Sequence, residues 1–127
     1  MAVILVVDDN VEFKTMLSDY FADLGYKLES ADNGREGIAK ARAIKPDMIF
    51  LDVMMPDVGG IEVLRELQAE DDTRNIPVLV ITGTYFDKSM SELFKQESNC
   101  YGFMTKTIEM SYLKKKVEEI LAKKTGK

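Results

Sequence analysis

Short, nearly continuous apolar runs recur along the chain at Val3–Val7, Met48–Leu51 and Val78–Ile81. Runs of this length, without alternation of apolar and polar residues, are typical of strands buried on both faces of a parallel sheet. Tyr26–Ser30 is a weaker, mixed run that we also interpret as a strand, and Phe103-Met104 opens a short fifth one. The pattern therefore predicts five strands.

Helical periodicity fills the stretches between these runs. Apolar residues recur there at three- and four-residue spacing, as on the buried stripe of an amphipathic helix. Gly25 and Pro46 follow the first two stretches and suit helix ends. We predict helices over residues 13–24, 34–44, 61–67, 88–97 and 112–121.

Strands and helices that alternate five times predict an α/β fold, a doubly wound (βα)5 domain with a five-stranded parallel sheet and helices on both faces. With 127 residues the chain has the length of one ordinary domain. We expect residues 1–127 to form this single domain, with no output domain. Each of the last two helices should bury an apolar stripe. The stripes are Met90, Leu93 and Phe94 on the fourth helix, and Tyr112, Leu113, Val117, Ile120 and Leu121 on the fifth.

Composition removes several classes of function. The chain has no histidine, which excludes a Ser-His-Asp or Cys-His catalytic site, a histidine-ligated metal and a histidine phosphocarrier. The one cysteine, Cys100, excludes an internal disulfide and a cysteine-based zinc site, and it fits the reducing cytoplasm. A net charge of −5 argues against direct nucleic-acid binding. The longest apolar run, Met1–Val7, is far below the roughly 20 residues that span a bilayer, so we expect no membrane partner.

Charged and hydroxyl residues stand where the predicted strands end. Asp8-Asp9 follow the first strand, Asp52 the third, Thr82-Gly83 the fourth and Lys106 the last. The carboxyl ends of parallel strands share one edge of a sheet, so these groups should meet. At ~5 Å and an effective dielectric near 20, each pair of carboxylates costs roughly 3 kcal/mol. Lys106 offsets part of this repulsion, and a set of oxygen ligands without His or Cys favours magnesium.

This set of groups suits phosphoryl transfer. A carboxylate such as that of Asp52 can attack phosphorus and form an acyl phosphate. The transition state spreads negative charge over three equatorial oxygens, which magnesium, Lys106, Thr82 and the amides near Val53 and Gly83 can stabilise. Taken alone, an Asp-Asp pair after a strand is often a turn or a helix N-cap. The joint pattern at several strand ends indicates a functional site.

With these motifs the chain resembles the receiver domain of two-component response regulators, with the single-domain chemotaxis regulator as a structural relative. The motifs that carry the resemblance extend over the whole length. They are ILVVDDN (4–10), ADNGREGIAKA (31–41), PDMIFLDVMMPDVGGIEVL (46–64), PVLVITGT (77–84) and GFMTK (102–106). The resemblance implies the flavodoxin-like strand order 2-1-3-4-5.

The resemblance also implies a role for each matching residue. Asp52 matches the aspartate that accepts a phosphoryl group from a partner's phosphohistidine, on a histidine kinase or a histidine phosphotransfer protein. Asp8 and Asp9 match the acid pair that holds magnesium, and the carbonyl of Met54 falls where the family supplies a backbone ligand. The chain would then catalyse its own phosphorylation and dephosphorylation rather than turn over a substrate.

The switch implied by the resemblance involves three further positions. Thr82 matches the hydroxyl residue that moves toward the phosphoryl group, and Lys106 matches the lysine that pairs with it. Phe103 matches the aromatic residue whose rotamer changes with them. The surface of the fourth helix, fifth strand and fifth helix would then change and control binding of an effector protein, which the sequence does not identify.

The sequence departs from the family at two places. Thr107 follows the lysine where the family usually has proline, often after a cis bond; a cis bond before a non-proline residue costs ~3 kcal/mol, which favours a trans bond here. Asn99-Cys100 replaces the usual Gly-Ala before the last strand. We expect Asn99 to adopt the left-handed conformation of a helix end and Cys100 to be structural.

Three other functions compete with that of an activated switch. A phosphorelay intermediate or phosphate sink without a dedicated effector uses the same residues and stays open. A flavodoxin-type electron carrier needs a Ser/Thr/Gly-rich loop after the first strand, and Asp8-Asp9-Asn10 is its electrostatic opposite. A haloacid-dehalogenase-type phosphatase needs a second Asp two residues after the nucleophile, where this chain has Met54.

Overall fold

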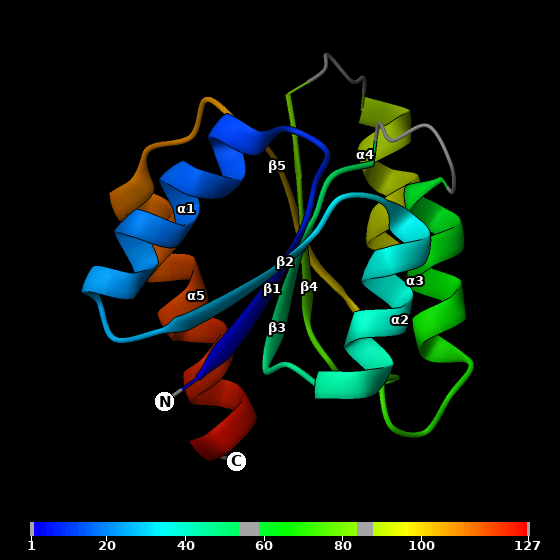
Figure 1. Ribbon diagram of the computed structural model, residues 1–127. Helices are drawn as coiled ribbons and strands as arrows, with labels where there is room; N and C mark the ends of the chain where they lie inside the picture. Colours follow the sequence, from blue (N-terminus) through cyan, green and yellow to red (C-terminus); the bar gives the residue numbers. More distant parts are fainter. Residues whose placement is uncertain (1, 54–58, 84–87, 127) are drawn as a thin grey trace.

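The computed structural model describes residues 2–53, 59–83 and 88–126, with side chains described except at 88–90 and 124–126. Strands and helices alternate along it (Figure 1). They are β1 (Val3–Val7), α1 (Val11–Asp23), β2 (Lys27–Ala31), α2 (Gly34–Ile44), β3 (Met48–Leu51), α3 (Gly60–Gln68), β4 (Val78–Thr82), α4 (Lys88–Lys95), β5 (Cys100–Thr105) and α5 (Met110–Gly126). Within these ranges we find no helix with the length and apolar character needed to cross a bilayer.

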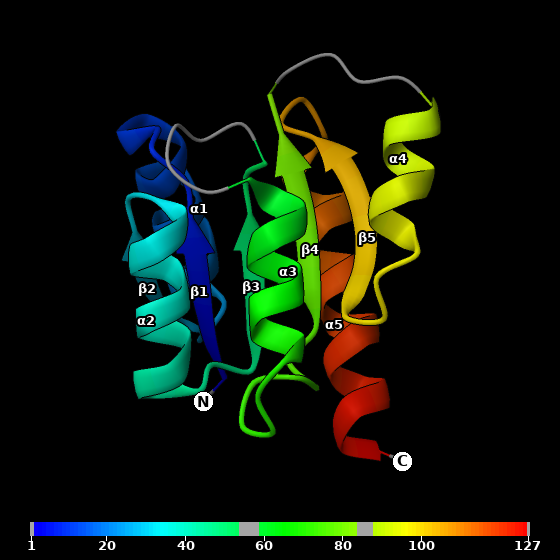
Figure 2. The same cartoon turned by 90° about the vertical axis from the view of Figure 1, so that its right-hand side faces the viewer.

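The strands form one parallel sheet in the order β2-β1-β3-β4-β5. Helices α1 and α5 cover one face, while α2, α3 and α4 cover the other (Figure 1). All strand arrows point the same way, and both termini lie at the opposite end of the molecule from the arrowheads (Figure 2). The predicted doubly wound (βα)5 fold and its flavodoxin-like order are confirmed.

The central strands are buried on both faces, which explains their continuous apolar sequence. In β1, Leu5 and Val7 belong to the core beneath α2 and α3, while Ile4 and Val6 belong to the core beneath α1 and α5. Both clusters draw residues from β3 and β4 as well. Because successive side chains of a strand point to opposite faces, two hydrophobic cores require apolar residues at every position.

The helix ends follow from local residue chemistry. Asn10 caps α1 by accepting a hydrogen bond from the Phe13 amide at 2.8 Å, and Gly25 takes a φ of 95° just beyond the last turn. At α2, Asn33 accepts from the Glu36 amide, while the Glu36 carboxylate accepts from the Asp32 amide, both at 2.8 Å. Such reciprocal capping fixes where the helix begins, so the loop after β2 has a defined path.

The edge of the sheet at β5 differs from the sequence expectation. The strand begins at Cys100 rather than Phe103, and its pairing with β4 shifts register at Tyr101, between Cys100 and Gly102. Leu93 and Tyr112, which we expected to be buried, are 47% and 56% exposed, so that expectation is wrong for both. A helix that flanks an edge strand has less sheet to cover, and its buried stripe is narrower. The side chain of Met90 lies outside the described residues.

Asn99 has a different role from the one expected. Its backbone is not left-handed, since among the described residues other than glycine only Lys45 has a positive φ. Its side chain is buried, donates to the Leu64 carbonyl at 3.1 Å and accepts from Gln68 Nε2 at 2.9 Å. Both partners lie on α3, so Asn99 ties the start of β5 to that helix through buried hydrogen bonds.

Candidate functional site

Backbone hydrogen bonds just beyond the ladders join the ends of neighbouring strands, β1 to β2, β3 to β1 and β5 to β4. The Asp8 amide donates to the Ala31 carbonyl at 3.1 Å, and the Asp52 amide donates to the Val7 carbonyl at 2.9 Å. At the other side of the sheet, the Lys106 amide donates to the Thr82 carbonyl at 2.9 Å. These bonds place the carboxylates, the hydroxyl and the ammonium side chain at one edge, as the sequence predicted.

Three carboxylates meet at this edge. Oxygens of Asp8, Asp9 and Asp52 all lie within 4.8 Å of one another. Asp8 and Asp52 are only 2% and 5% exposed, while Asp9 is exposed and stands at the opening. Oxygen ligands from two buried carboxylates and one exposed carboxylate fit a hard divalent cation that keeps part of its water shell, which is the behaviour of Mg²⁺. The cluster can therefore hold such an ion.

Lys106 supplies positive charge to the same cluster. Its Nζ lies 2.8 Å from Asp8 Oδ2 and 3.6 Å from Asp52 Oδ2, and its side chain is mostly buried. The stem passes close to Gly83, where an added Cβ would lie 3.2 Å from Lys106 Cδ. The bond to Thr107 is trans, because no peptide bond among the described residues is cis. The lysine thus reaches both buried carboxylates without a proline after it.

Burial and a neighbouring negative charge raise the pKa of Asp8. Desolvation raises the pKa of its carboxyl above the ordinary value, and the nearby charge of Asp52 raises it further. Hydrogen bonds from Lys106 and from the Asn10 amide, at 2.8 Å to Oδ1, act in the opposite direction. The protein therefore compensates the negative charge of Asp8 only in part. A cation bound between Asp8 and Asp52 would favour the ionised form of Asp8.

The other residues that the resemblance implicates lie around this cluster. Thr82 is buried at the end of β4, Val53 follows Asp52 directly and is buried, and Gly83 is exposed at the edge. Phe103 pairs in register with Val80, two residues below Thr82, and its ring centroid lies 5.2 Å from that of Phe94 on α4. Met54, whose carbonyl was expected to ligate the metal, lies outside the described residues.

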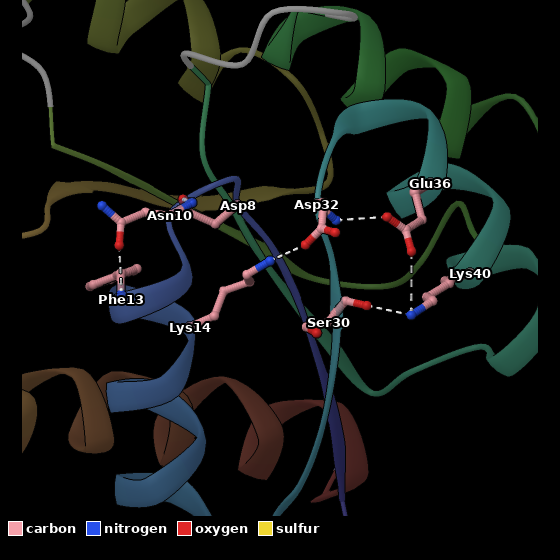
Figure 3. Close-up of polar contacts among 8 residues, drawn as sticks. All are labelled: Asp8, Asn10, Phe13, Lys14, Ser30, Asp32, Glu36 and Lys40. Atoms are coloured by element: carbon pink, nitrogen blue, oxygen red, sulfur yellow. Dashed lines mark hydrogen bonds and ion pairs between the residues drawn. The ribbon is translucent and has the colours of Figure 1, made fainter.

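The structure adds neighbours that the sequence pattern did not single out. Lys14, on the buried side of α1, forms an ion pair with Asp32 in the loop after β2 (Figure 3). One residue earlier, the ring of Phe13 lies 4.7 Å from Lys106 Nζ. A lysine on the apolar face of a predicted helix could have signalled an ion pair with a partner at the surface. Phe13 gave no such signal, because it matches the helical periodicity of any core residue.

The Lys14–Asp32 pair gives a pH-dependent contribution to stability. The Lys14 ammonium holds the pKa of the Asp32 carboxyl below its ordinary value. A carboxyl whose pKa is lower in the folded state stabilises the fold above its unfolded pKa, and this contribution is lost as pH falls through the folded value. We expect the wild-type melting temperature to fall more than that of Asp32→Asn between about pH 5 and pH 3. Equal falls would contradict a stabilising pair.

Comparison with known proteins agrees with this arrangement. Residues 4–118 match the family model of the response regulator receiver domain, and the chain belongs to this family. It is 30% identical over 122 residues to the PilH protein of Pseudomonas aeruginosa, covering 96% of this chain and 99% of that protein. It is 31% identical over 107 residues to the polar-differentiation response regulator DivK of Brucella anthropi, covering 84% of this chain and 85% of DivK.

Solved structures extend the comparison to the fold. The chemotaxis response regulator CheY4 of Vibrio cholerae matches with a TM-score of 0.85 and 29% identity, over 94% of this chain and 98% of that one. The chain is thus a receiver domain of the two-component or chemotaxis type. Receiver domains bind Mg²⁺ at an acidic pocket, and the cluster of Asp8, Asp9 and Asp52 is the matching feature here.

Proposed function

We propose that this chain is a phosphorylation-activated signalling switch whose phosphoacceptor is Asp52. A partner phosphohistidine, on a histidine kinase or a histidine phosphotransfer protein, donates the phosphoryl group. The observation that carries this proposal is the convergence of Asp8, Asp9 and Asp52 within 4.8 Å of one another, with Lys106 contacting two of them. Within this proposal the whole chain is one receiver domain that acts in the cytoplasm with protein partners.

In the proposed reaction a carboxylate oxygen of Asp52 attacks phosphorus, and the bond from phosphorus to the donor's imidazole nitrogen breaks. Negative charge on the equatorial oxygens is stabilised by the Lys106 ammonium, the Thr82 hydroxyl and the amides near Val53 and Gly83. Asp8, Asp9 and Asp52 would hold a magnesium ion, with the Met54 carbonyl as the further ligand that the resemblance implies, and the ion would supply further positive charge. Burial of Asp52 lowers the local dielectric and strengthens each of these interactions.

The proposed output follows from the new charge. An aspartyl phosphate carries close to −2, and Thr82 and Lys106 can pair with it by moving toward Asp52. Space released beside Thr82 allows Phe103, which contacts Phe94 on α4, to change its rotamer. The surface of α4, β5 and α5 then changes. A hollow of about 280 Å³ on this surface is the proposed effector site, lined by Lys95, Tyr101, Gly102, Phe103, Met104, Tyr112 and Lys116.

Acetyl phosphate tests the proposal without knowledge of the partner. Wild-type protein with acetyl phosphate and Mg²⁺ is expected to gain the mass of one phosphoryl group, measured by intact mass spectrometry at neutral pH. Asp52→Ala should gain none, and chelation of Mg²⁺ should suppress the wild-type gain. Asp19→Ala, an exposed aspartate on α1, serves as the control and should behave as wild type. An undiminished gain in Asp52→Ala would remove the proposal.

A further inference from the structure

The ammonium of Lys106 rests against an aromatic ring as well as against carboxylates. Its Nζ lies 4.7 Å from the centroid of the Phe13 ring, while Asp8 Oδ2 is 2.8 Å away. Phe13 is 8% exposed, so little water competes for this face of the ring. Cations within about 6 Å of an aromatic centroid are attracted to the ring face, and the attraction grows with desolvation.

The position of Phe13 is set by the same loop that forms the carboxylate cluster. The Phe13 amide donates to Asn10 Oδ1, and the Asn10 amide donates to Asp8 Oδ1, both at 2.8 Å (Figure 3). The helix N-cap therefore fixes Phe13 and the buried carboxylate relative to each other. On the other side, the Lys106 stem is close to Gly83, where even a Cβ would approach Cδ to 3.2 Å.

We propose that Phe13 is a positioning residue for phosphoryl transfer at Asp52, and that its ring holds the Lys106 ammonium inside the site. This inference rests on the proposed function. A lysine has a long, flexible stem, and without the ring its ammonium could turn toward water. The ring attracts the cation with a quadrupole rather than with a full charge. Lys106 therefore stays inside the site and can still move from Asp8 to a phosphoryl oxygen on Asp52.

A purely structural role for Phe13 makes a different prediction. The residue also packs in the core cluster beneath α1 and α5, and a packing role depends on ring size and shape. A positioning role depends on the negative potential of the ring face. Fluorination of the ring separates the two, because it reduces this potential with little change in shape.

The test introduces phenylalanine with one, two or three ring fluorines at position 13 of the full chain. The initial rate of phosphorylation by acetyl phosphate with Mg²⁺ is expected to fall stepwise, by about threefold to tenfold at three fluorines. The side-chain ¹⁵Nζ resonance of Lys106, measured by NMR without acetyl phosphate, is expected to shift in the same order. Phe13→Tyr should retain most of the phosphorylation rate. In Phe13→Leu the rate should fall about as much as with the trifluorinated ring.

The same fluorinated residues at position 50 are the matched control. Phe50 is buried in the same cluster as Phe13, but among the described residues the ring over Lys106 Nζ is that of Phe13. They should leave both the rate and the Lys106 resonance unchanged. A rate and a resonance that do not respond to fluorination at position 13 overturn the inference. If no variant or wild type is phosphorylated, the proposed function fails, and the Lys106 resonance still decides whether Phe13 holds the ammonium.

Discussion

Replacement of Asp52 by asparagine is expected to abolish phosphorylation and, at the same time, to stabilise the metal-free protein. Asp52 is buried, and its charge lies beside that of Asp8. Repulsion between the two carboxylates therefore lowers the free energy of unfolding when no cation is bound. Two carboxylates at this separation repel by about 3 kcal/mol, of which Lys106 offsets part. We expect a net gain of about 1–2 kcal/mol, or about 3–6 °C in melting temperature.

Thermal unfolding with a chelator and with excess Mg²⁺ measures both effects. Wild-type protein should be stabilised by Mg²⁺, since a ligand that binds only the folded state raises its stability, whereas Asp52→Asn should respond much less. Asp19→Asn changes the net charge equally at an exposed position on α1 and is the control. A variant at position 52 that is less stable than wild type in chelator would show that the cluster does not store repulsion.

The second large effect is expected from truncation of Phe21 to alanine. Phe21 is fully buried on α1, and its ring packs edge-on against Tyr20, Tyr26 and Phe50, with centroids 5.3, 5.6 and 5.7 Å away. Loss of a buried phenylalanine ring typically costs about 3–5 kcal/mol, against a total stability of about 5–15 kcal/mol for a domain. We therefore expect the free energy of unfolding to fall by a large fraction.

Urea unfolding followed by circular dichroism measures this loss. Met16→Ala is the matched control on the same helix, because Met16 is 43% exposed and its truncation should change the free energy of unfolding by well under about 1 kcal/mol. A loss at Phe21 no larger than that at Met16 would mean that the aromatic cluster beneath α1 is not a core of the fold.

The central strands could be predicted from sequence because burial on both faces makes them almost continuously apolar, with Thr82 at the end of β4 as the polar exception. Val3–Val7 and Met48–Leu51 match the observed strands in full. The edge strand β5 could not be delimited in the same way, since an edge strand tolerates the bulge at Tyr101 and a mixed sequence. The role of Asn99 could not be predicted from its neighbours in the sequence, because its buried side chain bonds to partners on α3 that lie more than 30 residues away along the chain.

The site residues also fall into those that the sequence could predict and those that it could not. Asp8, Asp52 and Lys106 could be predicted to meet because each directly follows a strand, and parallel strands end at one edge. The ring of Phe13 and the Lys14–Asp32 pair could not, because they depend on how α1 is rotated against the sheet. Helical periodicity marks which residues face inward, and it does not say which charged group each of them meets.

Magnesium titration of ¹⁵N-labelled wild-type protein, followed by NMR, is the decisive measurement. The amide signals of Asp9, Asp52 and Gly83 should shift and saturate as the ion fills the acidic edge of the sheet, and in Asp52→Asn saturation should require a much higher concentration. If those signals stay in place while Mg²⁺ is in large excess, the three carboxylates do not form a metal site, and phosphoryl transfer to Asp52 by the proposed route is excluded.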